Sequence, residues 1–134
     1  MDLMIYTDGA ARGNPGKAAI GFSIYSTKGK RLTESSTYIG TATNNIAEYR
    51  AIIAALTAAH SLSHGAITCH SDSQLVISQL KGAWKVKQQH IKNLCAQVKR
   101  LEQQFSSVSY CHVPRENPHI MRVDRMINRE LDKH

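Results

Sequence analysis

The chain of 134 residues has the size of one globular domain, and we expect residues 1–134 to form a single domain. Its three cysteines lie far apart, which excludes the short spacing of a zinc site and predicts reduced thiols. No segment approaches the roughly eighteen apolar residues of a membrane span, so we expect a cytoplasmic protein with no membrane partner. A formal charge of +7 suits a polyanion such as nucleic acid, although basicity alone is weak support.

The first third of the chain predicts an antiparallel sheet. Three runs of apolar, β-branched and aromatic residues indicate strands: Leu3–Thr7, Ala18–Tyr25 and Leu32–Ile39. The first strand is expected to end at Asp8, because the turn-forming residues of Ala11–Gly16 indicate a loop after it. The turn Thr27–Lys30 separates the second and third strands, as in a hairpin.

The rest of the chain predicts helices that alternate with two short strands. Apolar residues recur every three or four positions after Thr41, which predicts a helix that is capped by Thr43 or Asn44 and stops at Gly65. A strand, two helical segments, a strand and a last helix are expected to follow: Ile67–His70, Ser71–Leu80, Ile91–Phe105, Val108–Val113 and Ile120–Leu131. This order predicts an α/β fold, with a mixed sheet covered by helices and its chemistry beyond the strand ends.

Four acidic residues stand at or near the ends of these elements. Asp8 ends the first strand and Asp72 follows the fourth, while Glu48 lies one turn into the first helix and Asp124 near the start of the last. A carboxylate among apolar strand residues is costly to bury unless it is paired or bound to metal. Each acid also has a simpler interpretation, since Asp8 can open a turn and Asp72 can cap a helix.

The residues around these acids form short segments that follow one another in a recognisable order. They are Thr7-Asp8-Gly9-Ala10 with Gly13-Asn14-Pro15-Gly16, Thr43–Tyr49, Ser71-Asp72-Ser73, Gly82–Lys87, His112–Glu116 and Val123–Asn128. In order and spacing they resemble the type 1 ribonuclease H family, and the chain is similar to its short bacterial members. The likeness covers nearly the whole chain and is far more specific than any single short motif.

The resemblance implies a ribonuclease H-like fold, whose five-stranded mixed sheet has three antiparallel strands and then two parallel ones. It also implies a metal-dependent endonuclease that hydrolyses the RNA strand of RNA/DNA hybrids and leaves 5′-phosphate and 3′-hydroxyl ends. Two Mg²⁺ or Mn²⁺ ions are implied, with four catalytic and metal-binding residues: Asp8, Glu48, Asp72 and Asp124. In the family the acid that matches Asp8 bridges both ions, and hard cations of this kind prefer oxygen ligands.

An enzyme that selects RNA must sense the 2′-hydroxyl group, which distinguishes RNA from DNA. Amide side chains can both donate to and accept from a hydroxyl. In the family such residues line the minor groove around the RNA strand, and they match Asn14, Asn44, Asn45 and Gln74. The threonine that matches Thr43 touches a DNA phosphate. These residues also suit structural roles, because Asn14 precedes Pro15 in a turn and Asn44 or Asn45 can start a helix.

A basic segment and one histidine add further candidates. Lysines surround a single aromatic residue, Trp84, and are Lys81, Lys85, Lys87 and Lys92. Trp84, Lys85 and Lys87 suit the backbone and sugars of a DNA strand, but a solvated loop with a buried Trp84 is the alternative. His119 lies where some family members keep a mobile histidine for proton transfer or product release. No protein partner is implied, and a monomer is expected.

The chain departs from the family pattern just before Asp124. Ile120 and Val123 stand where the family has an Asn and a small residue, and the loop that contains Pro118 is longer than in similar short members. These departures leave open a non-catalytic module that binds hybrids or double-stranded RNA. Another phosphoryl-transfer enzyme of the same superfamily, such as a DNA nuclease, is a further alternative, although the paired Asn44 and Asn45 favour RNA.

Overall fold

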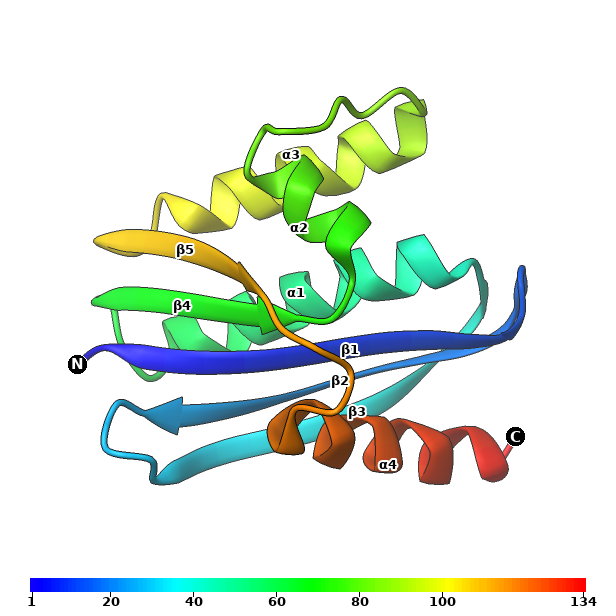
Figure 1. The fold of residues 1–134 in the computed structure, drawn as a ribbon, viewed down its shortest axis with the longest axis horizontal. Coiled ribbons are helices and arrows are strands. Elements are labelled where there is room, and N and C mark those ends of the chain that lie inside the picture. The colour runs from blue at the N-terminus through cyan, green and yellow to red at the C-terminus, as the bar shows by residue number, and fades with distance from the viewer.

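The computed structural model describes all residues, 1–134, as one five-stranded sheet with helices on both faces (Figure 1). The strands are β1 (Leu3–Gly13), β2 (Gly16–Ser26), β3 (Arg31–Ala42), β4 (Ala66–Ser71) and β5 (Ser107–His112). Their order across the sheet is β3-β2-β1-β4-β5. Strands β1, β2 and β3 pair antiparallel, whereas β4 pairs parallel with both β1 and β5. The predicted fold class, with three antiparallel strands and then two parallel ones, is confirmed.

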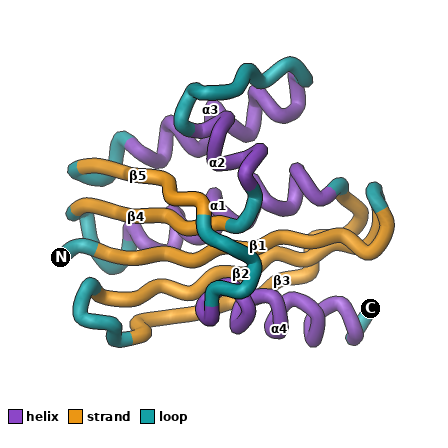
Figure 2. The backbone as a smooth tube through the Cα atoms, in the orientation of Figure 1, coloured by secondary structure: helices purple, strands orange, loops and turns teal.

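Four helices cover the sheet, and α4 lies apart from the other three (Figure 2). They are α1 (Asn44–His60), α2 (Gln74–Leu80), α3 (Gln89–Glu102) and α4 (Pro118–Asp132). No helix combines the length and the apolar character that crossing a membrane would require.

The alternation of side chains along β2 explains how one sheet supports helices on both faces. Ala18 and Ile20 pack with Ala47 and Ala51 of α1. The intervening Ala19 packs instead with apolar residues of α4, which are Val123, Ile127 and Leu131. Because successive side chains of a strand point to opposite faces, α1 and α4 lie on opposite sides of the sheet. Both helices therefore approach the central strands, where the acids lie.

Strand β1 is longer than the sequence predicted, and Asp8 is not at its end. The pairing with β2 continues from Asp8, which lies opposite Gly21, as far as Gly13. Gly13 then adopts φ +96°, a conformation that glycine tolerates and that turns the chain at once into β2. The turn-forming residues thus make a tight hairpin rather than a loop, and the prediction that Asp8 ends the strand was wrong.

Helix α1 is shorter than predicted, because it ends at His60 rather than just before Gly65. Its last carbonyl groups are satisfied early: the Ser61 hydroxyl donates to the Ala58 oxygen at 2.7 Å, and the Ser61 amide bonds there as well. Ser71, predicted to begin the next helix, belongs instead to β4, and α2 starts after the Ser73 cap. The remaining boundaries differ only slightly from those predicted.

Helix α4 starts earlier than predicted, at Pro118. The Asn117 side chain accepts hydrogen bonds from the amides of His119 and Ile120 at 2.9 and 3.3 Å, which is the geometry of a helix cap. Proline suits the first turn, because the amide that it lacks would have no partner there. The residues expected to lengthen the loop therefore form helix, and Asp124 lies near the middle of α4 rather than near its start.

Candidate active site

Three carboxylates from three different elements meet beside the middle of β1. Asp8 comes from β1, Glu48 from the second turn of α1, and Asp72 from the residue that follows β4. Ligand oxygens of the three lie within 4.8 Å of one another. Asp8 and Glu48 are each only 7% exposed. The sequence prediction that these three acids gather at one site is therefore matched by their geometry.

Glycine at position 9 allows this approach. A Cβ atom on Gly9 would lie 2.4 Å from the Ala47 carbonyl carbon and oxygen and 2.6 Å from the Glu48 nitrogen. Because no side chain intervenes, the first turns of α1 can rest directly against β1. The Gly9 amide then donates to Glu48 Oε1 at 2.7 Å and to Asp8 Oδ1 at 3.0 Å. One backbone amide thus joins two of the three carboxylates.

A buried hydroxyl orients the second oxygen of Glu48. The Ser71 hydroxyl donates to Glu48 Oε2 at 3.2 Å, and the same Ser71 oxygen accepts from the Ser73 amide at 3.1 Å. Glu48 is therefore held at both oxygens, by β1 on one side and by the end of β4 on the other.

No cationic side chain of the protein pairs with the three carboxyl groups. Burial raises the pKa of Asp8 far above its usual value, and the nearby charge of Glu48 raises it further. Burial likewise raises the pKa of Glu48 and of Asp72. None of the ion pairs in the protein involves these three side chains. Buried carboxylates without a partner are costly, and cations would relieve that cost.

Asp124 reaches the same cavity from α4, which lies on the face of the sheet opposite α1. It lines a cavity of about 540 Å³ together with Asp8, Glu48 and Asp72, but it is not one of the three acids within 4.8 Å. Its charge contributes to the raised pKa of both Asp8 and Asp72. The structure therefore brings all four predicted acids to one cavity, as a close trio and a more distant fourth member.

The donor set fits divalent cations. All the clustered ligands are carboxylate oxygens, the type that Mg²⁺ and Mn²⁺ prefer, and they come from rigid elements of the sheet and of α1. Asp8, Glu48 and Asp72 could hold one ion. Asp8 and Asp124 line the same cavity from β1 and α4, and together they could hold a second ion.

Two of the predicted substrate-binding asparagines also join the β1–β2 hairpin to α1. Asn14 Oδ1 accepts from the Asn44 amide at 3.1 Å, and Asn44 Oδ1 accepts from the Ala11 amide at 2.9 Å. These bonds use only the side-chain oxygens, so the NH₂ group of each amide keeps its two donors. The structural and substrate interpretations of the asparagines are therefore compatible.

Asn45 connects the acidic cavity to two neighbouring ones. It lines a cavity of about 280 Å³ with Lys85 and Lys87, and another of about 290 Å³ with Asn14 and Thr43. Asn45 also lines the acidic cavity. Basic and amide side chains predicted to hold the substrate thus line two cavities that share Asn45 with the acidic one.

Three other candidates lie outside these cavities. Trp84 is 47% exposed, which contradicts a place in the core, and Gln74 is exposed at the start of α2. The His119 ring packs against Tyr6 and Tyr25, with ring centroids 4.4 and 4.6 Å apart. The structure does not bring His119 into the acidic cavity, because the early start of α4 places it in the first turn of that helix.

Arg115 is a cavity residue to which the sequence analysis assigned no role. It lines the acidic cavity together with Glu116, and its charge opposes the rise in the pKa of Asp72. The sequence signal that could have identified Arg115 was its place in the His112–Glu116 segment, one of those that resemble the ribonuclease H family. A guanidinium beside the carboxylates can contact a phosphate group that the acids and their ions approach.

Comparisons with known proteins agree with this geometry. A family model described as "Reverse transcriptase-like" matches residues 6–120. The chain is 42% identical to ribonuclease HI of Halobacterium salinarum over 127 residues, which are 95% of this chain and 63% of that protein. The chain thus spans less than two thirds of this curated relative.

Solved structures extend the likeness to the whole fold. The crystal structure of RNase H1 from the halophilic archaeon Halobacterium salinarum matches with a TM-score of 0.95 and 40% identity, over 100% of both chains. The LC11-RNase H1 structure in complex with an RNA/DNA hybrid matches with a TM-score of 0.92 and 38% identity, over 98% of this chain and 97% of that one. By sequence, by fold and by the acids gathered on β1, this chain belongs to the type 1 ribonuclease H family.

Proposed function

We propose that this chain hydrolyses the RNA strand of RNA/DNA hybrids with two divalent ions, Mg²⁺ or Mn²⁺, and leaves 5′-phosphate and 3′-hydroxyl ends. The observation that carries the proposal is the trio of Asp8, Glu48 and Asp72, whose oxygens lie within 4.8 Å and have no cationic partner. The structural relative that was solved with an RNA/DNA hybrid supports the choice of substrate.

The protein contributes to hydrolysis by binding the ions and by keeping their ligands oriented. When bound, the two ions supply Lewis-acid activation of water and of the scissile phosphate. Asp8, Glu48, Asp72 and Asp124 would hold them, with Asp8 as the ligand common to both. The Gly9 amide and the Ser71 hydroxyl keep Glu48 oriented, so the ligand set is arranged before substrate arrives. Arg115 contributes a positive charge toward the phosphate on the Asp72 side of the cavity.

Selection of the hybrid uses the groups left free by the fold. The NH₂ groups of Asn14 and Asn44 can donate to 2′-hydroxyls of the RNA strand. Thr43 Oγ1 accepts from the Ile46 amide at 3.2 Å, and its own hydrogen remains free to donate to a DNA phosphate. Lys85 and Lys87 add positive charge along the same path, and the exposed Trp84 offers a face for a sugar.

The position of Asp124 favours a second candidate function, a module that binds hybrids without cutting them. Asp124 stands outside the close trio, so an ion shared with Asp8 is held by fewer ligands than the other. If that ion binds too weakly, the hybrid would dock while the phosphate remained intact.

One assay separates the two candidates. The purified protein is incubated with a hybrid labelled on the RNA strand, with Mg²⁺ or with Mn²⁺, and in parallel with an all-DNA duplex. We expect RNA fragments with 5′-phosphate ends, no cleavage of DNA, and no product from the matched Asp72→Asn variant. Binding of the hybrid without product in either metal would support the binding module, and cleavage of the DNA duplex would contradict the substrate proposed.

A further inference from the structure

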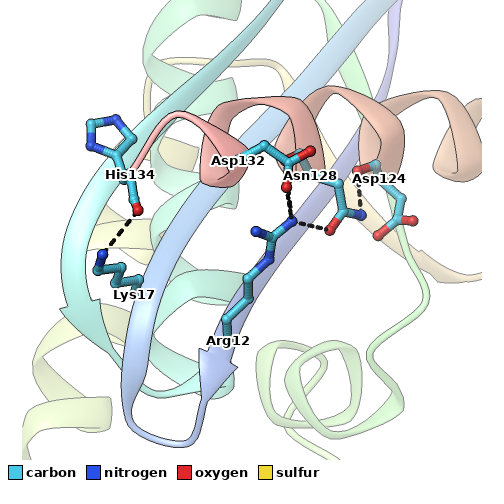
Figure 3. A network of polar contacts seen from close by, with 6 residues as sticks. All are labelled: Arg12, Lys17, Asp124, Asn128, Asp132 and His134. Carbon is cyan, nitrogen blue, oxygen red and sulfur yellow. Dashed lines mark hydrogen bonds and ion pairs between the residues drawn. The ribbon is translucent and has the colours of Figure 1, made fainter.

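A polar clasp joins the sheet to α4 beside Asp124 (Figure 3). Arg12 of β1 directs one guanidinium nitrogen to the Asp132 carboxylate at 2.6 Å, and to the backbone and side-chain oxygens of Asn128, both at 3.3 Å. The Asn128 side chain in turn donates to the backbone oxygen of Asp124 at 3.0 Å. The contacts therefore run from β1 to the backbone of Asp124, the residue that carries the fourth carboxylate.

The clasp connects the same two elements as the carboxylates that would share an ion. Asp8 and Arg12 are four residues apart on β1, so their side chains point to the same face of the sheet. Asp124 and Asn128 are four residues apart on α4, so they lie on the same side of the helix, about one turn apart. The separation of β1 and α4 at the clasp thus constrains their separation at Asp8 and Asp124.

Polar contacts on two sides of α4 add to the apolar packing that orients the helix. Val123 and Ile127 rest over Gly21 of β2, where a Cβ atom would meet their side chains at 3.0 and 3.1 Å, and this fixes how deeply the helix sits. On the β3 side, Arg122 donates to the two Glu34 oxygens at 2.8 and 3.0 Å. The Arg12 clasp is the counterpart on the β1 side. Because β1 and β3 flank β2, the two clasps oppose rotation of α4 about its own axis.

We propose that Arg12 is a positioning residue for Asp124, which it holds through Asn128 and α4 where the carboxylate can share an ion with Asp8. The inference rests on the proposed function. Arg12 is not among the residues that line the acidic cavity, so it acts through α4 rather than on the substrate. The ion pair with Asp132 has side-chain exposures of 47% and 67%, so its contribution to stability is small and its role is geometric.

The test compares two variants that remove one positive charge each. Arg12→Met removes the guanidinium group that forms the clasp but keeps an unbranched chain like the aliphatic part of arginine. Lys17→Met is the matched control, because Lys17 Nζ donates to the His134 oxygen at 2.9 Å and so joins β2 to the chain just after the same helix (Figure 3). Mg²⁺ is titrated into each protein, and backbone amide chemical shifts are followed near Asp124 and near Gly9 and Glu48.

We expect Arg12→Met to raise the Mg²⁺ concentration for half-maximal shift near Asp124 by roughly ten-fold, the usual scale for groups that orient metal ligands. The Mg²⁺ concentration for half-maximal shift near Gly9 and Glu48 should stay as in the unsubstituted protein. Lys17→Met should change the Mg²⁺ response at neither place. In the cleavage assay, Arg12→Met should need more Mg²⁺ but keep its KM for the hybrid. Arg12→Lys should be intermediate, because lysine keeps the positive charge but its nitrogen does not extend as far from the backbone as the terminal guanidinium nitrogen that makes these contacts.

Three results would overturn the inference. These are an unchanged Mg²⁺ response near Asp124 in Arg12→Met, an equal change in Lys17→Met, and the absence of any Mg²⁺-dependent shift near Asp124 in the unsubstituted protein. Failure of the proposed function is recognised separately, because the unsubstituted protein would then cut no hybrid at any Mg²⁺ or Mn²⁺ concentration.

Discussion

Replacing Asp8 by Asn should abolish cleavage of the hybrid and stabilise the metal-free protein. The substitution removes the carboxylate that we propose to be shared by both ions, and we expect the rate to fall at least about 10³-fold, or roughly 4 kcal/mol in the barrier. Without metal, the folded protein must keep a proton on the buried Asp8 carboxyl beside Glu48, and an amide at this position removes that cost. The cleavage rate and the free energy of unfolding in a chelator measure the two effects.

The stability gain from Asp8→Asn should depend on pH. Burial and the charge of Glu48 raise the pKa of Asp8 in the folded protein above the value of about 3.9 expected for the unfolded chain. Folding therefore favours the protonated carboxyl, whose contribution to stability is present below the unfolded pKa and is lost as the pH rises. With EDTA, the unfolding free energy should fall with increasing pH more steeply in the unsubstituted protein than in Asp8→Asn.

Asp2→Asn provides the control for the loss of cleavage expected in Asp8→Asn. Asp2 accepts a hydrogen bond from the Ala66 amide at 3.0 Å at the start of the sheet, and an Asn oxygen can accept the same bond. Cleavage should therefore be unchanged in Asp2→Asn. Residual cleavage by Asp8→Asn close to that of Asp2→Asn would show that Asp8 is not the shared ligand.

Replacing Gly9 by Ala should damage both the fold and the metal site. The new methyl group would lie 2.4 Å from the carbonyl of Ala47, and this backbone cannot swing aside as a side chain could. The start of α1 must move away from β1, which stretches the 2.7 Å bond between the Gly9 amide and Glu48. We expect the free energy of unfolding to fall by about 3 kcal/mol, which is at the upper end of the range for overpacking. The melting temperature should then fall by roughly 10 °C.

The same displacement separates Glu48 from Asp8, so Mn²⁺ should raise the melting temperature of Gly9→Ala far less than that of the unsubstituted protein. Gly29→Ala is the control, because a Cβ atom there meets nothing within 4 Å and only the φ of +90° is strained. Such strain costs about 1–2 kcal/mol. Equal losses of stability in the two variants, with an equal response to Mn²⁺, would contradict the packing argument.

The fold and the acidic trio could be predicted from the sequence because their signals are local and repeated. Each of Asp8, Glu48 and Asp72 lies within a well-matched segment, and the apolar periodicity around it identifies a strand or a helix. The place of Asp8 within β1 could not be predicted, because Gly9 and its small neighbours indicate a turn when they are read alone. Their pairing with Ala18–Ile20 of β2 is a tertiary contact that local preference does not encode.

The region before Asp124 was the least predictable part of the site. Pro118 suggests a loop in a linear reading, but the Asn117 cap converts it into the first residue of α4. That change moves His119 against Tyr6 and Tyr25 and leaves Arg115 in the cavity. The roles of these residues depend on where a helix begins, and such boundaries are the least reliable part of a sequence-based prediction.

Because of the exposed ion pairs on either side of α4, the two proposed ion positions should respond differently to ionic strength. Dissolved salt screens the Arg12–Asp132 and Arg122–Glu34 pairs, whereas the buried bonds to Glu48 are shielded from it. Salt also weakens contacts between lysines and phosphates. Raising the salt concentration should therefore act twice, since it would weaken binding of the proposed hybrid and the contacts that hold α4, while the trio around Glu48 keeps its shape.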